Sequence, residues 1–594
     1  MPPDVHAVAQ YARQVNEGTP ATTPPGVLPG LVPIVGWLGS YDRRWLRGDL
    51  IAGVTVAALI VPKNLGYAAI AGVPVQNGLY AAAAGALLYG IFGTCRQISM
   101  GPSSGLAAVA ASTVVAAGLT DGADVASFVA GLTLASGLLF LVLAVLRMGW
   151  IAQFLSRAVV TGFLFGAAID VVIGELPKLT GTDVSGANPF EELRSWFGSL
   201  DDTNGVTLAV GSVALLVVFG LRVVAPRVPG ALVLLVGGLL ASYLFDLGDH
   251  GVALVGDVPR GLPSFDMPDV GLMWDHVIPV ALGAFALMLI GFSQTAGDGR
   301  AFAAKHRYQI DINQESIAQS AANIGAGVFH GMPVSTSLSA SSLNDHSGAR
   351  TGLASLTSGV TVLLTLLVLA PLFSQLPKPV LGALIIEAVV MGMMDVPEMR
   401  RIYRVQRLDF WVAVAAIVGT LAVGVLAGVM IGIGLSLLWL IAVATQPDMP
   451  LLAREPGTQV YRDLTENPDD ERPIGVAVVR LDGGLFFATS DALEDRVRTL
   501  IQETPDVTAV VIDLEGVNFI DSQGSAKVAD ILELCARAGV TLRLAHVKPV
   551  VRTVLERERL VERLGSDHIH GNVHRAVEAQ KAEPATARDP DVPG

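Results

Sequence analysis

Two polar interruptions lie within otherwise apolar sequence, and both contain residue types that can hold an anion. Residues 99–105 read Ser-Met-Gly-Pro-Ser-Ser-Gly, and residues 331–342 read Gly-Met-Pro-Val-Ser-Thr-Ser-Leu-Ser-Ala-Ser-Ser. A helix that begins inside a membrane exposes its first N–H groups and the positive end of its dipole. Two such helix ends that face each other, with hydroxyl groups as further donors, would bind an anion without a fixed charge.

The positions of the two interruptions favour this interpretation over a purely structural one. They fall about seven apolar runs apart, in corresponding halves of the apolar sequence. Paired broken segments of this kind mark the binding site of many transporters. The alternative is that proline and serine only kink packed membrane helices, which is common.

The elements that must position these segments are membrane helices. The chain has 594 residues, of which 52% are hydrophobic and only 15% are charged, whereas soluble domains carry about 25% charged residues. Between residues 48 and 444 there are roughly twelve to fourteen apolar runs near the length that crosses a bilayer. The net charge of −14 is concentrated outside these runs and argues against nucleic acid as a partner.

The distribution of basic residues predicts the orientation. If the chain starts inside, most lysines and arginines, among them Arg43, Arg157 and Arg400, fall in inner loops. We therefore predict a multi-pass protein of the inner (plasma) membrane with both termini in the cytoplasm. Residues 1–44 are then a cytoplasmic N-terminal segment, and residues 45–446 form the transmembrane domain.

The composition changes after Thr445. Residues 447–472 are charged and punctuated by Pro and Gly, which is typical of a linker. Residues 474–481, 509–514 and 541–545 are predicted as short buried strands, and residues 490–501 and 524–538 as amphipathic helices. Alternating strands and helices predict a small parallel α/β domain over residues 473–580. The Pro- and charge-rich residues 581–594 are predicted to be disordered.

Several ordered motifs of the apolar part resemble the SulP sulfate-permease family. They are Gly-Asp-Leu-Ile-Ala-Gly-Val-Thr (48–55), Val-Pro-Lys-Asn-Leu-Gly-Tyr-Ala (61–68), Gly-Thr-Cys-Arg-Gln-Ile-Ser-Met-Gly-Pro (93–102), Asn-Gln-Glu (313–315) and Gly-Ala-Arg-Thr (348–351). The resemblance implies fourteen spans in two inverted seven-span repeats. A core domain with the two half-helices would slide against a gate domain, in a homodimer that moves small anions.

The C-terminal part resembles the STAS domain that ends most such permeases. The resemblance rests on residues 510–514 and on Val-Asn-Phe-Ile-Asp-Ser-Gln-Gly at 517–524, where a strand leads to Asp521 and Ser522 at a helix start. In related soluble regulators a hydroxyl in this loop is phosphorylated, which implies a regulatory site and a cytoplasmic regulatory partner. The alternative is that Asp521 and Ser522 only cap the helix.

Three positions depart from the family pattern. Lys63 stands where the family has a glutamine, Ala340 where the tenth span has an arginine, and Gln294 where the eighth span has a glutamate. Asp298 follows Gln294 by one helical turn, on the same face.

We infer that other residues carry the charges of the site. Lys63 replaces the missing arginine as the positive charge, and Asp298 replaces the missing glutamate as the carboxylate that binds a coupling proton or sodium ion. The alternative places Lys63 at a membrane interface and Asp298 at the cytoplasmic end beside Arg300. The resemblance places Asp170, Glu175 and Glu387 in the gate domain, where they are expected to form structural pairs or to lie at an interface rather than to contact the substrate. The expected substrate contacts are Lys63, Tyr67, Ser103, Ser337, Ser339 and the backbone at Ala340, with Gln294 and Asp298 opposite them.

These residues predict secondary active transport of a small anion by elevator-like alternation, either as symport or as exchange. The resemblance favours sulfate, followed by bicarbonate and dicarboxylates. Enzyme function is not expected, because the sequence has no phosphate-binding loop, no metalloprotease motif and no zinc spacing, and no cofactor is implied. The alternatives are a nucleobase symporter of the same architecture and a STAS-coupled anion sensor that has lost transport.

Overall fold

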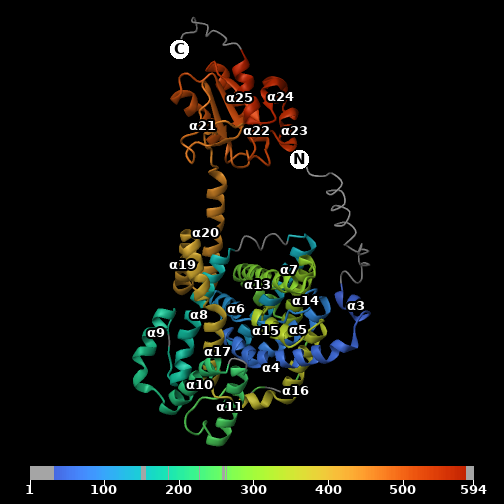
Figure 1. The fold of residues 1–594 in the computed structure, drawn as a ribbon. Coiled ribbons are helices and arrows are strands. Elements are labelled where there is room, and N and C mark those ends of the chain that lie inside the picture. Colours follow the sequence, from blue (N-terminus) through green and yellow to red (C-terminus); the bar gives the residue numbers. More distant parts are fainter. Residues whose placement is uncertain are drawn as a thin grey trace. The chain divides into compact units, whose positions relative to one another are not determined.

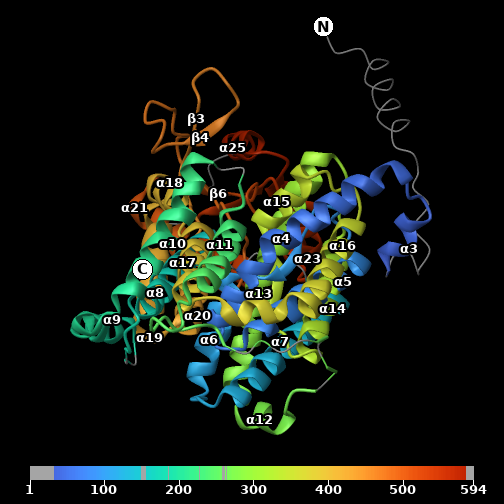
Figure 2. The same ribbon diagram turned by 90° about the horizontal axis from the view of Figure 1, so that it is seen from below.

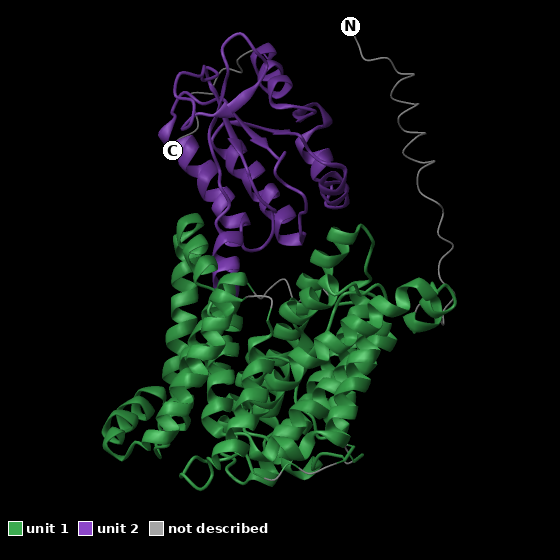
Figure 3. Cartoon of the chain, turned by 60° about the horizontal axis from the view of Figure 1, so that its bottom comes forward, with its two compact units in different colours: residues 1–436 green, residues 437–594 purple. Residues whose placement is uncertain are grey.

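The computed structural model describes residues 32–583, apart from 149–155, 185, 187, 226–227, 257, 259–260, 263 and 266. Most of the predicted N-terminal segment and the tail from residue 584 onward lie outside the described residues. The chain divides into two compact units, Met1–Ser436 and Leu437–Gly594 (Figure 3).

The first unit is a bundle of helices (Figure 1). Its first half contains α4 (Leu46–Ile70), α5 (Val75–Phe92), β1 (Met100–Pro102), α6 (Ser104–Ala116), α7 (Gly122–Val145), α8 (Arg157–Thr180), α9 (Pro189–Gly198), α10 (Gly205–Val224) and α11 (Gly230–Phe245). Its second half contains α12 (Val270–Asp275), α13 (Val277–His306), α14 (Ile312–Val328), β2 (Val334–Thr336), α15 (Leu338–His346), α16 (Leu353–Val368), α17 (Lys378–Met393), α18 (Val396–Val405), α19 (Arg407–Val423) and most of α20 (Val425–Thr445). A short helix, α3 (Pro33–Leu38), precedes the bundle.

Many of these helices suit a bilayer. In the described part of the chain, seven helical stretches are long and apolar enough to span a membrane, and α6, α11 and α16 are shorter apolar helices. Large apolar side chains remain exposed along them, such as Leu216, Ile278 and Val418. An exposed apolar surface of this extent is typical of a protein that lies in a membrane or contacts a partner.

The helix contacts repeat with an internal symmetry. The contact between α5 and α16 is matched by one between α14 and α7, and the contact between α4 and α15 by one between α13 and α6. Likewise α8 packs on α19 as α17 packs on α10, while α8 and α17 pack on each other. This pairing is that of two inverted repeats, α4–α11 and α13–α20, and confirms the fold class expected from the sequence.

The helices form two groups. We call α4–α7 with α13–α16 the core group, and α8, α10, α11, α17, α19 and α20 the gate group. In Figure 2, α4, α5, α14 and α16 lie on one side of the unit, and α8, α10, α11 and α17 lie on the other.

The second unit contains the predicted parallel α/β fold. Its sheet has the order β5 (Val476–Arg480), β6 (Ala509–Asp513), β7 (Thr541–Ala545) and β8 (Ile569–His570), all parallel. The helices are α21 (Ser490–Glu503), α22 (Ser522–Arg537), α23 (Pro549–Arg557), α24 (Leu560–Leu564) and α25 (Val573–Ala582). The three strands predicted from short apolar runs agree with β5, β6 and β7 to within a few residues, and the two helices predicted from helical spacing agree with α21 and α22.

The segment predicted as a linker is instead folded. Within residues 447–472, β3 (Leu452–Arg454) and β4 (Tyr461–Asp463) form an antiparallel pair. Leu452 is buried in the same cluster as Val476 and Val478 of β5, and Arg462 forms an ion pair with Asp470 at 2.6 Å. Charged residues that pair with one another resemble a solvated linker in sequence, which explains the error.

Close helix contacts in the first unit depend on glycine. A Cβ atom on Gly162 of α8 would lie 2.4 Å from the Ala413 carbonyl oxygen of α19, whereas one on Gly220 of α10 would have no atom within 4 Å. Small residues allow membrane helices to approach each other in this way.

We therefore predict that Gly162→Ala lowers stability by about 1–3 kcal/mol, because the backbones must separate. Gly220→Ala is the matched control and should leave stability unchanged or slightly raised, since alanine favours the helix. Thermal unfolding of the detergent-solubilised protein measures both. Equal midpoints for the two variants would contradict the close packing of α8 on α19.

Candidate functional site

A small pocket lies where α4 passes the two interrupted segments. It is lined by Leu59, Ile60, Lys63, Asn64, Tyr67, Ser99, Met100, Gly101, Pro102, Ser337, Ser339 and Ala340. Its volume of about 10 Å³ is enough for about one water-sized group. The structure thus brings together Lys63, Tyr67, Ser337, Ser339 and Ala340, which the sequence analysis predicted as neighbours.

The interrupted segments meet as two antiparallel strands. Gly101 of β1 faces Ser335 of β2, at the centre of the register. Beyond the strands, the Ser337 N–H donates to the Ser99 carbonyl oxygen at 3.1 Å, and the Ser99 N–H donates to Ser341 Oγ at 2.9 Å. These hydrogen bonds pair backbone N–H and C=O groups where the two segments are not helical. Both α6 and α15 can therefore begin inside the unit.

The start of α15 supplies donors to the pocket. Ser337 caps this helix, because its Oγ accepts from the Ala340 N–H at 3.4 Å and lies 3.3 Å from Ser339 Oγ. The N–H groups of Leu338 and Ser339, in the first turn, have no partner within the helix. Both residues are exposed, although the strand before them is buried.

The start of α6 is arranged differently. Ser103 caps it by accepting from the Leu106 N–H at 3.4 Å, and Ser103 is not among the residues that line the pocket. Ser103 thus caps α6, and its predicted contact with the substrate stays a prediction. The β1 residues Gly101 and Pro102 form that side of the pocket instead.

Polar side chains of α14 hold the second strand in place. The Gln319 and Asn323 side-chain amides donate to the Val334 carbonyl oxygen at 2.7 and 3.0 Å, and Asn323 Oδ1 accepts from the Val334 N–H at 3.0 Å. Ser335 Oγ donates to the Gly291 carbonyl oxygen of α13 at 3.2 Å. These bonds make the broken segment a fixed part of the core group.

Asn64 is a pocket residue that the sequence analysis did not single out. It is only 2% exposed, and its Nδ2 has no hydrogen-bond partner among the described residues. A buried donor without a partner costs free energy, so its retention points to a ligand that accepts from it. The sequence does contain a signal that could have revealed Asn64, namely a side-chain amide next to Lys63 within a run of apolar residues.

A wider cavity adjoins the pocket and shares Leu59, Lys63 and Ser339 with it. This cavity has a volume of about 320 Å³ and reaches Arg222 of α10 and Glu387 of α17. Arg222 Nη1 lies 3.0 Å from Glu387 Oε1. No described residue forms an ion pair with Lys63, so the described lining carries one positive charge more than negative.

Arg222 was missed in the sequence because it sits near the end of an apolar run, where it reads as an interfacial anchor. Glu387 was expected to form a structural pair, and it does, but it also faces the cavity.

Gln294 and Asp298 lie on α13, beside the strand rather than in the pocket. Asp298 Oδ2 accepts from Thr336 Oγ1 of β2 at 2.9 Å, and Gln294 Oε1 is buried without a partner among the described residues. Neither residue lines the pocket. Their role in coupling stays a prediction, now with a defined contact between Asp298 and the broken segment.

A second cavity adjoins the C-terminal end of α4. It has a volume of about 640 Å³ and is lined by Ala69 and Ile70 of α4, by the end of α6 and by residues of α8, α19 and α20. Lys178 and Glu175 of α8, which form an ion pair at 2.6 Å, also line it. α4 therefore borders both cavities, with Lys63 in the lining of the first, and each cavity is lined by residues of the core group and the gate group.

In the second unit, the predicted regulatory residues begin α22. Asp521 caps this helix by accepting from the Gly524 N–H at 2.7 Å, and its other oxygen accepts from the Phe487 N–H at 3.1 Å. Ser522 is the first helical residue and is exposed. Asp521 thus caps the helix, as the alternative interpretation expected, and the Ser522 side chain is exposed.

Comparison with known proteins identifies the family. Residues 46–416 match the sulfate permease family, and residues 467–576 match the STAS domain. The chain belongs to the sulfate permease family. It is therefore a multi-pass membrane transporter with a C-terminal STAS domain, and not an enzyme.

Curated relatives support the assignment along nearly the whole chain. A protein of Mycobacterium tuberculosis named a probable sulfate transporter is 32% identical over 94% of this chain and 99% of its own length. The chloroplastic sulfate transporter 4.1 of Arabidopsis thaliana is 28% identical over 92% of this chain and 82% of its own length.

Two solved structures share the fold. The murine Solute Carrier 26 family member A9 anion transporter in its inward-facing state matches with a TM-score of 0.85 at 22% identity, covering 96% of this chain and 98% of that chain. The transmembrane domain of the cyanobacterial bicarbonate transporter BicA matches with a TM-score of 0.59 at 21% identity, covering 66% of this chain and 99% of that chain.

The unpaired amide of Asn64 yields a prediction. Asn64→Asp keeps the size of the side chain but replaces the donor with a negative charge, so anion binding should weaken by about tenfold or more, or ~1.4 kcal/mol. Binding of radiolabelled sulfate to the solubilised protein measures the effect. Asn204→Asp is the control, because either residue caps α10 equally well. Undiminished binding by Asn64→Asp would show that Asn64 does not contact the anion.

Proposed function

We propose that the protein is a secondary active transporter of a small oxyanion, with sulfate as the first candidate and bicarbonate and dicarboxylates as the next. The observation that carries the proposal is the pocket in which Lys63, the Asn64 amide and the first turn of α15 converge. Each of these groups offers N–H donors, and a helix N-terminus adds favourable potential for an anion.

The pocket chemistry favours an anion that accepts hydrogen bonds at several oxygens. No acidic residue is among the described residues that line it. Buried charge needs both a counter-charge and hydrogen bonds, and Lys63 supplies the first while the amides supply the second. Because the pocket holds only about one water-sized group, a sulfate ion would extend from it into the wider cavity that Lys63 also lines.

The same chemistry disfavours a nucleobase symporter. Nucleobase sites in this architecture usually use acidic side chains to hold the base, and none is among the described residues that line the pocket. A STAS-coupled sensor remains the second candidate, because the pocket can bind an anion whether or not the protein moves it.

The two cavities support alternating access by an elevator-like movement. Lys63 and the broken segments belong to the core group, whereas Arg222 and Glu387 belong to the gate group. The β1–β2 pair and its anchors on α14 would move with the bound anion as one body. The gate group would remain in place, so that the pocket meets first one cavity and then the other.

Coupling is proposed to act through Asp298. Its carboxylate accepts from Thr336, which is the last residue of β2 before the helix start at the pocket. A proton or a sodium ion on Asp298 would remove a negative charge near the anion and change the hydrogen bond that fixes β2. The predicted homodimer, the plasma membrane location and a regulatory partner at Ser522 are parts of the same proposal.

Uptake into proteoliposomes tests the proposal. Radiolabelled sulfate, bicarbonate and succinate are offered separately, each with an inward proton gradient, an inward sodium gradient or a trans anion. We expect sulfate uptake that one of these gradients stimulates and that excess unlabelled sulfate abolishes. Saturable sulfate binding without uptake under any condition would favour the sensor instead, and the absence of both would contradict an oxyanion site.

Lys63 provides the sharpest variant. Lys63→Gln removes the unpaired positive charge from the pocket, and Ala340 cannot replace it, so uptake should fall at least about tenfold. Lys378→Gln is the matched control, because it removes the same charge from an exposed position at the start of α17. Wild-type uptake by Lys63→Gln would contradict the relocation of the positive charge from the tenth span to α4.

A further inference from the structure

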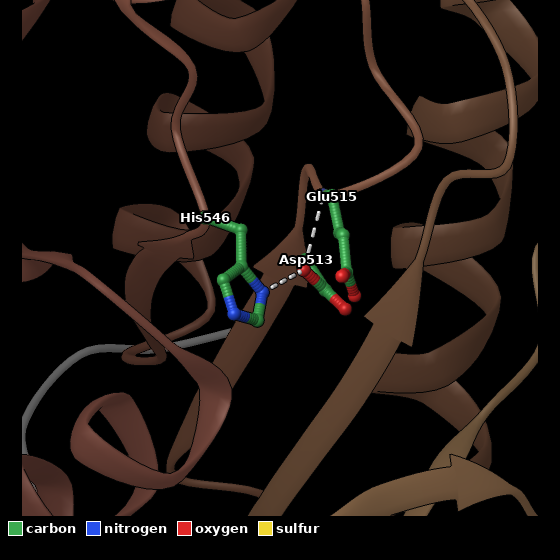
Figure 4. Close-up of side chains that lie close together, drawn as sticks. All are labelled: Asp513, Glu515 and His546. Carbon is green, nitrogen blue, oxygen red and sulfur yellow. Dashed lines mark hydrogen bonds and ion pairs between the residues drawn. The ribbon is translucent and has the colours of Figure 1, made fainter. Parts of the chain in front are cut away.

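Three side chains with metal-binding atoms converge at one edge of the sheet in the second unit. Asp513 is the last residue of β6, Glu515 follows it in the next turn, and His546 comes directly after β7. Because β6 and β7 are parallel neighbours with Asp513 opposite Ala545, the chain turns His546 toward Asp513 (Figure 4).

Their geometry is compact. His546 Nδ1 lies 2.8 Å from Asp513 Oδ1, and the potential ligand atoms of all three residues lie within 4.8 Å of one another. The Glu515 N–H donates to Asp513 Oδ1 at 3.1 Å, which folds the turn and holds the Glu515 carboxylate beside that of Asp513. The three groups come from two strand ends, and the sheet fixes their spacing.

Among the described residues, no lysine or arginine forms an ion pair with the carboxylate of Asp513 or of Glu515. Two carboxylates at this distance repel each other, and Asp513 is only 1% exposed. Burial raises the pKa of the Asp513 carboxyl, against the opposing effect of the hydrogen bond with His546. The nearby Lys548 ammonium donates instead to the Glu515 carbonyl oxygen and to Asn518 Oδ1.

We propose that Asp513, Glu515 and His546 bind a divalent transition-metal ion, Zn²⁺ or Mn²⁺. Two carboxylates and one imidazole form a ligand set that these ions accept, whereas Ca²⁺ prefers oxygen ligands alone. His546 Nδ1 and Asp513 Oδ1 lie at hydrogen-bond distance, 2.8 Å, which is near the roughly 3.0 Å between adjacent ligands of an octahedral ion, whereas a tetrahedral Zn²⁺ would hold them about 3.4 Å apart. Because Glu515 is exposed, water can complete the coordination shell.

A bound ion would affect the loop that leads to the predicted regulatory residues Asp521 and Ser522. Residues 514–520 connect this site to Asp521, the cap of α22. An ion that joins the ends of β6 and β7 would restrict that connection. The proposal does not depend on which anion the membrane part transports.

The test uses the full-length, tag-free protein in detergent after treatment with a chelator and its removal. Titration calorimetry with ZnCl₂ and with MnCl₂ measures affinity and stoichiometry, and electron paramagnetic resonance of Mn²⁺ shows whether a nitrogen ligand is present. We expect one ion per chain at micromolar concentration or below. Failure of the wild-type protein to bind either metal would overturn the proposal.

Two variants and a control locate the site. His546→Asn keeps the left-handed backbone at this residue, where φ is +53°, because asparagine tolerates that conformation. We expect it to remove the nitrogen signal and to weaken binding about 10- to 100-fold. Glu515→Gln should weaken binding about tenfold, while Glu558→Gln, an exposed glutamate elsewhere in the unit, should bind as the wild type does. Unchanged affinity in both site variants would place the ion elsewhere and overturn the proposal.

Discussion

The architecture of the membrane unit depends on one pairing, that of β1 with β2. Within a bilayer every backbone N–H and C=O group needs a partner inside the protein, so a helix can be interrupted only where another segment completes its hydrogen bonds. Three residues from each repeat do this for each other, with Gly101 opposite Ser335. Because β1, β2 and the side chains of α14 together satisfy this backbone, α6 and α15 can both start in the middle of the unit, and the first turn of α15 lines the pocket.

The residues that match the family motifs largely serve this arrangement. The Asp49 carboxylate accepts from the Arg350 and Thr351 N–H groups and so fixes the start of α16 against α4. The Glu315 carboxylate accepts from Tyr89 Oη and from the Thr94 and Cys95 N–H groups, which fixes the turn that leads into β1. These buried carboxylates fix the loops beside the site, while the charged side chains that line the wider cavity are Lys63, Arg222 and Glu387.

Features that a local sequence pattern determines could be predicted from the sequence alone. Glycine, proline and serine within apolar runs revealed both breaks, short apolar runs located β5, β6 and β7, and helical spacing located α21 and α22. Features that depend on tertiary packing could not be predicted. Arg222 and Glu387 are distant in sequence and share a cavity only because α10 packs on α17. Ser103 and Ser337 look equivalent in sequence, yet only Ser337 lines the pocket. Asp298 lies behind the strand, because the helical face it shares with Gln294 packs on β2.

The central claim is that the anion sits between Lys63 and the start of α15. Anomalous diffraction from crystals grown with selenate, which has the charge and shape of sulfate and a strong selenium signal, tests it most directly. The account predicts one dominant peak within hydrogen-bonding reach of Lys63 Nζ, Asn64 Nδ2 and the Ser339 N–H, and its loss in Lys63→Gln crystals. A dominant peak beside Arg222 alone, or a peak at the pocket that Lys63→Gln leaves unchanged, would contradict it.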